Sequence, residues 1–232
     1  MKTVLLFTMS DVGAAQHIIP ILKMLKKNSN FIFKVLASSP ADQILKYHKI
    51  DYIYFRPMPN NRFDPSESDL KVMNEFLSEI YDNFKPKLVI TGVANDRYGP
   101  DEAAIIMAKK KYIPTSIILD DFGPIHKIDN SYADYLFATT KKIYDWSKAN
   151  YPCKTYLIGS IKHNEILKLP IGQMRKSTRR DLKIKKNEIV ITFMAQNENM
   201  SGHNENFMML VKALKNISTR SLPFKLIVRP HP

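Results

Sequence analysis

Residues 3–25 read TVLLFTMSDVGAAQHIIPILKML, which is an apolar run, then a polar turn, then an amphipathic segment. The run Thr3–Thr8 is typical of a buried β-strand. Beyond the turn, the spacing predicts a helix over 17–28. Its apolar residues form a buried stripe and its lysines face water: Ile18, Ile21, Leu22 and Leu25 against Lys23, Lys26 and Lys27. Because Pro20 fits a first helical turn, we expect this helix to begin near 17–20.

The alternation of strand and helix patterns continues along the chain. Apolar runs predict further strands at 31–37, 87–91, 115–119, 135–138, 155–158, 188–193 and 224–228. Helix-length segments separate most of them, at 66–84, 101–111, 141–149, 173–182 and 204–216. Such alternation predicts the α/β class, with a parallel sheet covered on both faces. A ligand crevice is then expected where the strands end, at their carboxyl edge.

Composition excludes several protein classes. The chain has 232 residues, of which 44% are hydrophobic and 25% charged, so a mainly disordered protein is not expected. Cys153 is the only cysteine, which excludes a disulfide scaffold and suits the reducing cytoplasm. No apolar run approaches the ~20 residues that a membrane-spanning helix requires.

Positive charge is concentrated in one segment. The chain carries a formal net charge of +13, and residues 167–186 contain eight lysines and arginines against the single acid Asp181. Such a segment attracts phosphate, on a nucleotide or on an anionic membrane surface, although a solvated face has the same appearance. Nucleic acid is not an expected partner, because zinc-ligand spacing, an aromatic RNA-binding signature and a helix-turn-helix pattern are all missing.

The same region marks a domain boundary. Residues 169–172, LPIG, interrupt the pattern, and a new strand-helix-strand unit follows. We therefore predict a first domain at 1–165, a basic linker at 166–186 and the start of a second domain at 187–232. Three elements cannot cover both faces of a sheet. We expect either that the protein continues beyond Pro232 or that a partner chain or second copy completes this unit.

Two loops carry candidate polar chemistry. Asp121 lies in the run DDFG after a predicted strand, where a carboxylate acts as a general base or binds a sugar hydroxyl; a purely conformational turn is the alternative. No Asp-x-Asp is present, so no metal is predicted. Ser201 and Gly202 open a later helix, whose N-terminus is a natural phosphate site. Phosphate-loop and dinucleotide-binding motifs are missing, so ATP hydrolysis and dinucleotide redox chemistry lack support. The absence of a nucleophile elbow argues against a hydrolase of that class.

His17 is the candidate base of the first loop. The predicted helix start places it at the helix N-terminus, on the rim of the crevice, where the helix dipole keeps an imidazole neutral and ready to accept a proton. A capping or packing role is the alternative. Residues 15–20, AQHIIP, resemble the glycine-rich loop of GT-B glycosyltransferases, with alanines and a glutamine in place of most glycines. The resemblance implies that His17 is the catalytic base and that Gly13 belongs to the ligand-binding loop.

More of the chain is similar to that family. Residues 86–92, 113–121, 133–140 and 156–160 resemble successive strands of its N-terminal domain, and 179–193 resembles the entry to its donor domain. Residues 225–232, KLIVRPHP, resemble the strand-end His-Pro of transferases related to polysialyltransferases and glycerophosphate polymerases. There the histidine contacts the donor phosphate, which implies that role for His231 and, beside it, Arg229. Ser201 and Gly202 would approach the same diphosphate.

The resemblance implies two Rossmann-like parallel-sheet domains of GT-B type, the second incomplete in this chain. It implies a cytoplasmic glycosyltransferase that acts in surface glycan synthesis. The enzyme would use a nucleotide-sugar donor, no separate cofactor, and a glycan or lipid-linked acceptor. Peripheral association with the inner membrane face would suit the basic segment. Two alternatives remain open, a sugar-nucleotide 2-epimerase and a non-catalytic subunit that needs a partner chain.

Overall fold

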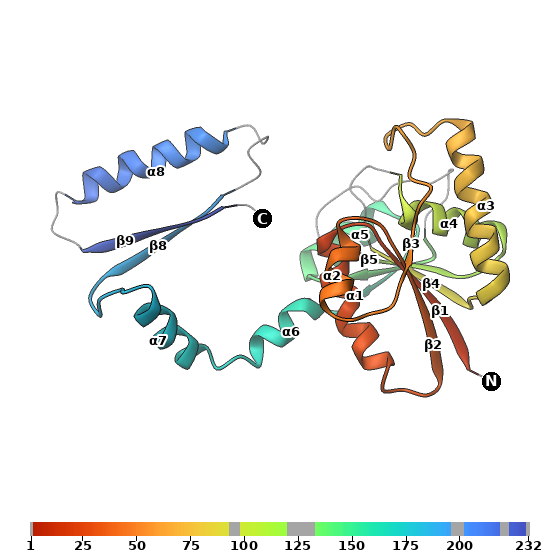
Figure 1. Cartoon of the computed structure of the whole chain (residues 1–232), viewed down its shortest axis with the longest axis horizontal. Helices are drawn as coiled ribbons and strands as arrows, with labels where there is room; N and C mark the ends of the chain where they lie inside the picture. Colours follow the sequence, from red (N-terminus) through yellow and green to blue (C-terminus); the bar gives the residue numbers. More distant parts are fainter. Residues whose placement is uncertain (1, 93–97, 120–132, 196–201, 219–222, 231–232) are drawn as a thin grey trace. The chain divides into compact units, whose positions relative to one another are not determined.

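A computed structural model describes residues 2–92, 98–119, 133–195, 202–218 and 223–230 (Figure 1). The chain divides into two compact units, Met1–Lys168 and Leu169–Pro232, which are described separately below.

The first unit is built on a seven-stranded parallel sheet in the order β3-β2-β1-β4-β5-β6-β7. Its strands are β1 (Thr3–Met9), β2 (Phe31–Ala37), β3 (Ile53–Tyr54), β4 (Leu88–Thr91), β5 (Thr115–Leu119), β6 (Tyr135–Ala138) and β7 (Lys154–Leu157). The chain runs outward from β1 to β3, then returns to pair β4 with the other edge of β1. The predicted α/β class with parallel strands is confirmed.

Helices cover both faces of this sheet (Figure 1). They are α1 (Val12–Leu25), α2 (Ala41–Tyr47), α3 (Glu67–Phe84), α4 (Pro100–Lys110), α5 (Lys141–Asn150) and α6 (Ile161–Leu167). Side chains alternate between the faces of a strand, so Phe7 and Met9 pack with α1 and α2, whereas Leu6 packs with α3 and α4. The continuous apolar run of β1 therefore contributes to two cores.

Helix α1 begins earlier than predicted. We expected its start near 17–20, but it begins at Val12, and the Oδ1 atom of Asp11 accepts a hydrogen bond of 2.7 Å from the Ala14 N–H. This cap satisfies one of the free N–H groups of the first turn. Pro20 lies inside the helix. Burial of Ala14 and Ile18 against the sheet stabilises the additional turns, although a proline inside a helix removes a backbone hydrogen bond.

The second unit contains a parallel pair of strands, β8 (Ile189–Met194) and β9 (Phe224–Arg229), with helices α7 (Ile171–Asp181) and α8 (His203–Ser218). The rings of Phe193 and Phe207 pack with their centroids 5.1 Å apart, which holds α8 on β8. The segment predicted as a basic linker includes all of α7, none of whose side chains is buried. Among the described residues, no helix has the length and apolar character needed to cross a bilayer.

Gly92, directly after β4, lies in close contact with α1. A Cβ atom at Gly92 would lie 2.2 Å from the Cβ of Ala14. Gly92→Ala should therefore lower the free energy of unfolding by about 1–3 kcal/mol, as overpacked cores do. Urea unfolding measures the change. The matched control is Gly172→Ala in α7, where a Cβ meets nothing within 4 Å; equal effects of the two changes would contradict the close approach.

Candidate active site

The candidate site lies at the carboxyl edge of the first sheet, where the strand order reverses between β1 and β4. Two hydroxyls at the end of β1 meet a carboxylate at the start of α4. Thr8 Oγ1 donates to Asp101 Oδ1 at 2.6 Å, and Ser10 Oγ donates to Asp101 Oδ2 at 2.7 Å. Both hydroxyl residues, Asp101 and the adjacent Glu102 are buried. Reversal points of this kind are where open parallel sheets bind ligands.

The local sequence explains why two acids begin this helix. Gly99 is the N-cap of α4, and Pro100 occupies the first helical position. Proline suits that position because its missing N–H would have no helical partner there. Asp101 and Glu102 then fall in the first turn, where the helix dipole favours negative charge.

Burial changes the ionisation of both acids. Burial raises the pKa of Asp101 to about 6; the hydrogen bonds from Thr8 and Ser10 oppose this rise, and the nearby charge of Asp11 adds to it. The pKa of Glu102 is raised well above its usual range, first by burial and then by the charge of Asp101. Among the described residues, none forms a hydrogen bond to Glu102 Oε2. Burial therefore favours the protonated form of Glu102, beside the Asp101 carboxyl, whose pKa of about 6 leaves it largely ionised at pH 7.

Arg62 brings a cation to the same place. Its Nε donates to the Tyr98 carbonyl at 2.9 Å, and the Tyr98 N–H donates to the Arg62 carbonyl at 2.6 Å. A Cβ atom at Gly99 would lie 3.0 Å from Arg62 Nη2 and 3.7 Å from Glu102 Oε2. The Arg62 guanidinium and the Glu102 carboxyl thus both lie close to Gly99. Such a group can bind a phosphate or carboxylate while a proton moves at the adjacent carboxyl.

His17 does not lie on the rim where we predicted it. Because α1 begins at Val12, His17 falls in the second turn and its side chain is only 1% exposed. Its pKa is lowered to about 4, first by burial and then by the positive charges of Lys162 and His163 on α6. The imidazole is therefore neutral, as expected, but through burial and neighbouring charge rather than through a helix terminus. Its role as catalytic base stays a prediction.

The residues predicted to bind phosphate are divided between the two units of the chain. Gly13 lies inside the first turn of α1 rather than in a loop, because Asp11 starts the helix early. Gly202 has φ +82° and immediately precedes α8, and Arg229 is exposed at the end of β9. Arg229 therefore lies at the carboxyl end of its strand. Asp121, Ser201 and His231 lie outside the described residues.

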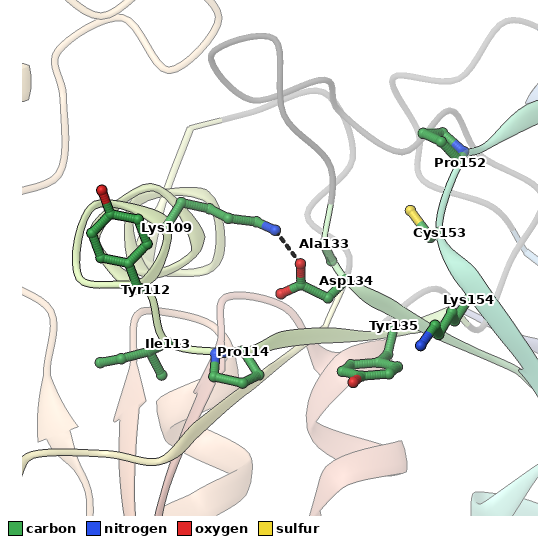
Figure 2. Close-up of a pocket in the computed structure, with 10 residues that line it drawn as sticks. All are labelled: Lys109, Tyr112, Ile113, Pro114, Ala133, Asp134, Tyr135, Pro152, Cys153 and Lys154. Atoms are coloured by element: carbon green, nitrogen blue, oxygen red, sulfur yellow. Dashed lines mark hydrogen bonds and ion pairs between the residues drawn. The ribbon is translucent and has the colours of Figure 1, made fainter.

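A cavity of about 760 Å³ lies at the opposite edge of the first sheet, where β5, β6 and β7 begin (Figure 2). Figure 2 shows the Lys109 side chain pointing to Asp134, with which it forms an ion pair. The N–H and hydroxyl of Thr115 both donate to Asp134 Oδ2 at 2.8 Å. Burial raises the pKa of Cys153 to about 11, so its thiol stays protonated at pH 7. These contacts join α4 to the sheet and supply no activated nucleophile.

The sequence patterns missed Asp101 and Glu102 as site residues. They were visible only as acids that open a helix, which is a common feature of surface helices. A usable signal was present. The acids follow Pro100, and the helix they begin comes directly after a strand predicted to end at the crevice.

Comparison with known proteins identifies similar solved structures. No protein-family model matches the chain, and no curated protein matches it by sequence. The UDP-GlcNAc 2-epimerase of Neisseria meningitidis, solved with UDP-GlcNAc, has a TM-score of 0.66 at 18% identity, over 99% of this chain and 66% of that one. The UDP-GlcNAc 2-epimerase of Methanocaldococcus jannaschii gives 0.64 at 14% identity, over 99% and 66%. MurG of Acinetobacter baumannii gives 0.53 at 11%, over 99% and 68%.

The chain thus spans about two thirds of the length of these structures. Identities this low establish the fold and leave the reaction open. Parallel strand order, helices on both faces and a second parallel unit all agree with that fold. The chain has a GT-B-like fold made of Rossmann-like parallel-sheet units.

Proposed function

We propose that this protein acts on a nucleotide sugar and that Asp101 and Glu102 are its acid–base pair. The observation that carries the proposal is the buried pair of carboxyl groups with raised pKa values beside Arg62, at the reversal point of a parallel sheet. Titratable groups that differ in protonation at one site are the requirement for moving protons at neutral pH. The UDP-GlcNAc bound to the Neisseria meningitidis epimerase supports the substrate class.

The carboxyl pair favours epimerisation at the sugar C2 carbon. That reaction would remove the C2 proton as the C1–O bond to UDP breaks, so that the electron pair of the C–H bond forms a C1–C2 double bond. A proton would then return to the opposite face of C2 as UDP bonds to C1 again, so the reaction uses a base and an acid. The carboxylate of Asp101 would accept the proton and the protonated carboxyl of Glu102 would donate one. The similarity to two UDP-GlcNAc 2-epimerases supports this reaction.

Glycosyl transfer is the second candidate. It needs one base for an acceptor hydroxyl and positive groups for the departing diphosphate. His17 would be the base, and Arg229 and His231 would bind phosphate, as the GT-B resemblance implies. Arg229 is the last residue of β9, at the carboxyl end of that strand, which supports a phosphate site there.

Incubation of the protein with UDP-GlcNAc in D₂O, followed by NMR, distinguishes these reactions. Epimerisation predicts deuterium at C2 and appearance of the second C2 epimer without any acceptor. Transfer predicts saturable UDP-GlcNAc binding without exchange at C2, and release of UDP once an acceptor is added. If UDP-GlcNAc does not bind, the proposed substrate class is wrong. Heat-unfolded protein is the control for uncatalysed exchange.

A further inference from the structure

A second cavity of the first unit, about 450 Å³ in volume, lies between α1, the residue after α2, and α6. Its lining combines basic, amide and apolar side chains: Gln16, Ile19, Pro20, Lys23, His48, Lys162 and His163. Within the part of the chain that the structure describes, no aspartate or glutamate lines this cavity. None of these residues belongs to the group around Asp101.

The basic side chains come from three separate elements and converge on one space. Lys23 of α1 donates from Nζ to His48 Nδ1 at 3.2 Å, which requires the unprotonated nitrogen of that imidazole. Lys162 and His163 approach from α6. Bringing positive groups together without a carboxylate is electrostatically unfavourable, and a bound anion removes that cost.

Burial and this concentration of positive charge lower the pKa values of two histidines. The pKa of His48 is lowered by burial and then by Lys23. The pKa of the buried His17, on the same helix as Lys23, is lowered by burial and then by Lys162 and His163. The positive electrostatic potential of the cavity therefore also acts on the buried part of α1.

We propose that this cavity binds the phosphate group of a small phosphorylated molecule. Lysine ammonium groups bind phosphate as point charges, and the Gln16 amide and the imidazoles add hydrogen-bond donors. Ile19 and Pro20 supply an apolar wall for the remainder of the molecule. The volume lies in the range of about 300–1,000 Å³ that small-ligand sites occupy.

The cavity lies beside α6, so a ligand bound there would contact the last helix of the first unit. α6 is the last helix of the first unit, and the second unit begins at Leu169. A phosphate held by Lys23 and Lys162 joins α6 to α1. Binding therefore stabilises the packing of the segment from which the chain enters its second unit. This site does not depend on the nucleotide-sugar reaction proposed above.

The test is a titration of the whole protein with inorganic phosphate at constant ionic strength, with the imidazole Hε1 resonances of His48 and His163 followed by NMR. We expect saturable shifts of both. Lys162→Gln and Lys23→Gln should each weaken binding about tenfold, the effect of losing one charge-assisted hydrogen bond. Lys110→Gln, an exposed lysine of α4, is the matched control and should bind as the unaltered protein does.

A parallel titration with glucose 1-phosphate distinguishes the source of the phosphate. Tighter binding than inorganic phosphate indicates a phosphorylated sugar, and equal binding indicates free phosphate. Lack of any saturable shift by about 10 mM phosphate, well above millimolar affinity, would overturn the proposal. Equal affinities of the Lys162→Gln and Lys110→Gln proteins would overturn it as well.

Discussion

Glu102→Gln should lower the turnover of UDP-GlcNAc by about 10²–10⁴, the range typical of a lost general acid or base. Because burial favours the protonated form of Glu102, glutamine resembles that form in shape and charge but has no acidic proton to donate. The fold should tolerate the change, since glutamine is uncharged and close to glutamate in shape. The loss is therefore expected in the rate and not in the folded fraction.

Steady-state kinetics and thermal unfolding of the same preparations measure both quantities. Glu75→Gln is the matched control, because Glu75 lies exposed on α3 in an i,i+4 pair with Lys71. It should leave turnover unchanged. If Glu102→Gln retains turnover within about twofold while Glu75→Gln behaves as expected, proton transfer by Glu102 is excluded and its raised pKa has only a structural cause.

The unfolding free energy of the His17→Gln protein should fall much less at acid pH than that of the unaltered protein. The pKa of His17 is about 4 in the folded chain against 6.5 for an ordinary histidine, so the unfolded chain binds a proton that the folded chain does not. Folding is then progressively disfavoured as pH falls from 6.5 to 4. The difference between these pKa values corresponds to about 3 kcal/mol of unfolding free energy.

Asp101 acts in the opposite direction. Its pKa is about 6 in the folded chain against 3.8 ordinarily, so the folded chain binds the additional proton between those values. Its protonation therefore stabilises the fold as pH falls through the range between those two values. Asp101→Asn should remove that gain, so its unfolding free energy should fall further at acid pH than that of the unaltered protein.

Urea unfolding between pH 4 and 7 separates the two groups. Relative to the unaltered protein, His17→Gln should gain stability as pH falls, and Asp101→Asn should lose it. Both changes are read as differences in slope, so the groups whose titration neither substitution alters cancel; for Asp101→Asn the difference includes the coupled titration of Glu102. Parallel curves for the unaltered and His17→Gln proteins would show that His17 titrates as it does in the unfolded chain, contrary to its burial.

The strands of this fold could be predicted because their signal is local. Strands 31–37, 115–119 and 135–138 have the predicted bounds, since an apolar β-branched run needs no knowledge of its neighbours. Three short elements were missed. β3 has only two residues, and α2 and α6 have seven each. Such lengths give too few repeats for a periodicity to be recognised.

The candidate site was less accessible to sequence reasoning. His17 was placed on the rim because Pro20 suggested a late helix start, whereas Asp11 supplied an earlier cap. Asp101 meets Thr8 across 93 positions in sequence, and this separation carries no local pattern. Burial is what distinguishes Asp101 and Glu102 from ordinary acids of a first helical turn, and burial follows from the reversal of strand order.

That reversal also sets an order of events during synthesis. β1 can pair with β2 once residue 37 has left the ribosome, but its other edge has no partner until residues 88–91 emerge. Through this interval the backbone of an apolar strand is exposed, which is the condition under which nascent chains aggregate or recruit chaperones. Asp101 emerges later still. The acceptor for the hydroxyls of Thr8 and Ser10 therefore emerges after both strands that flank β1 in the sheet.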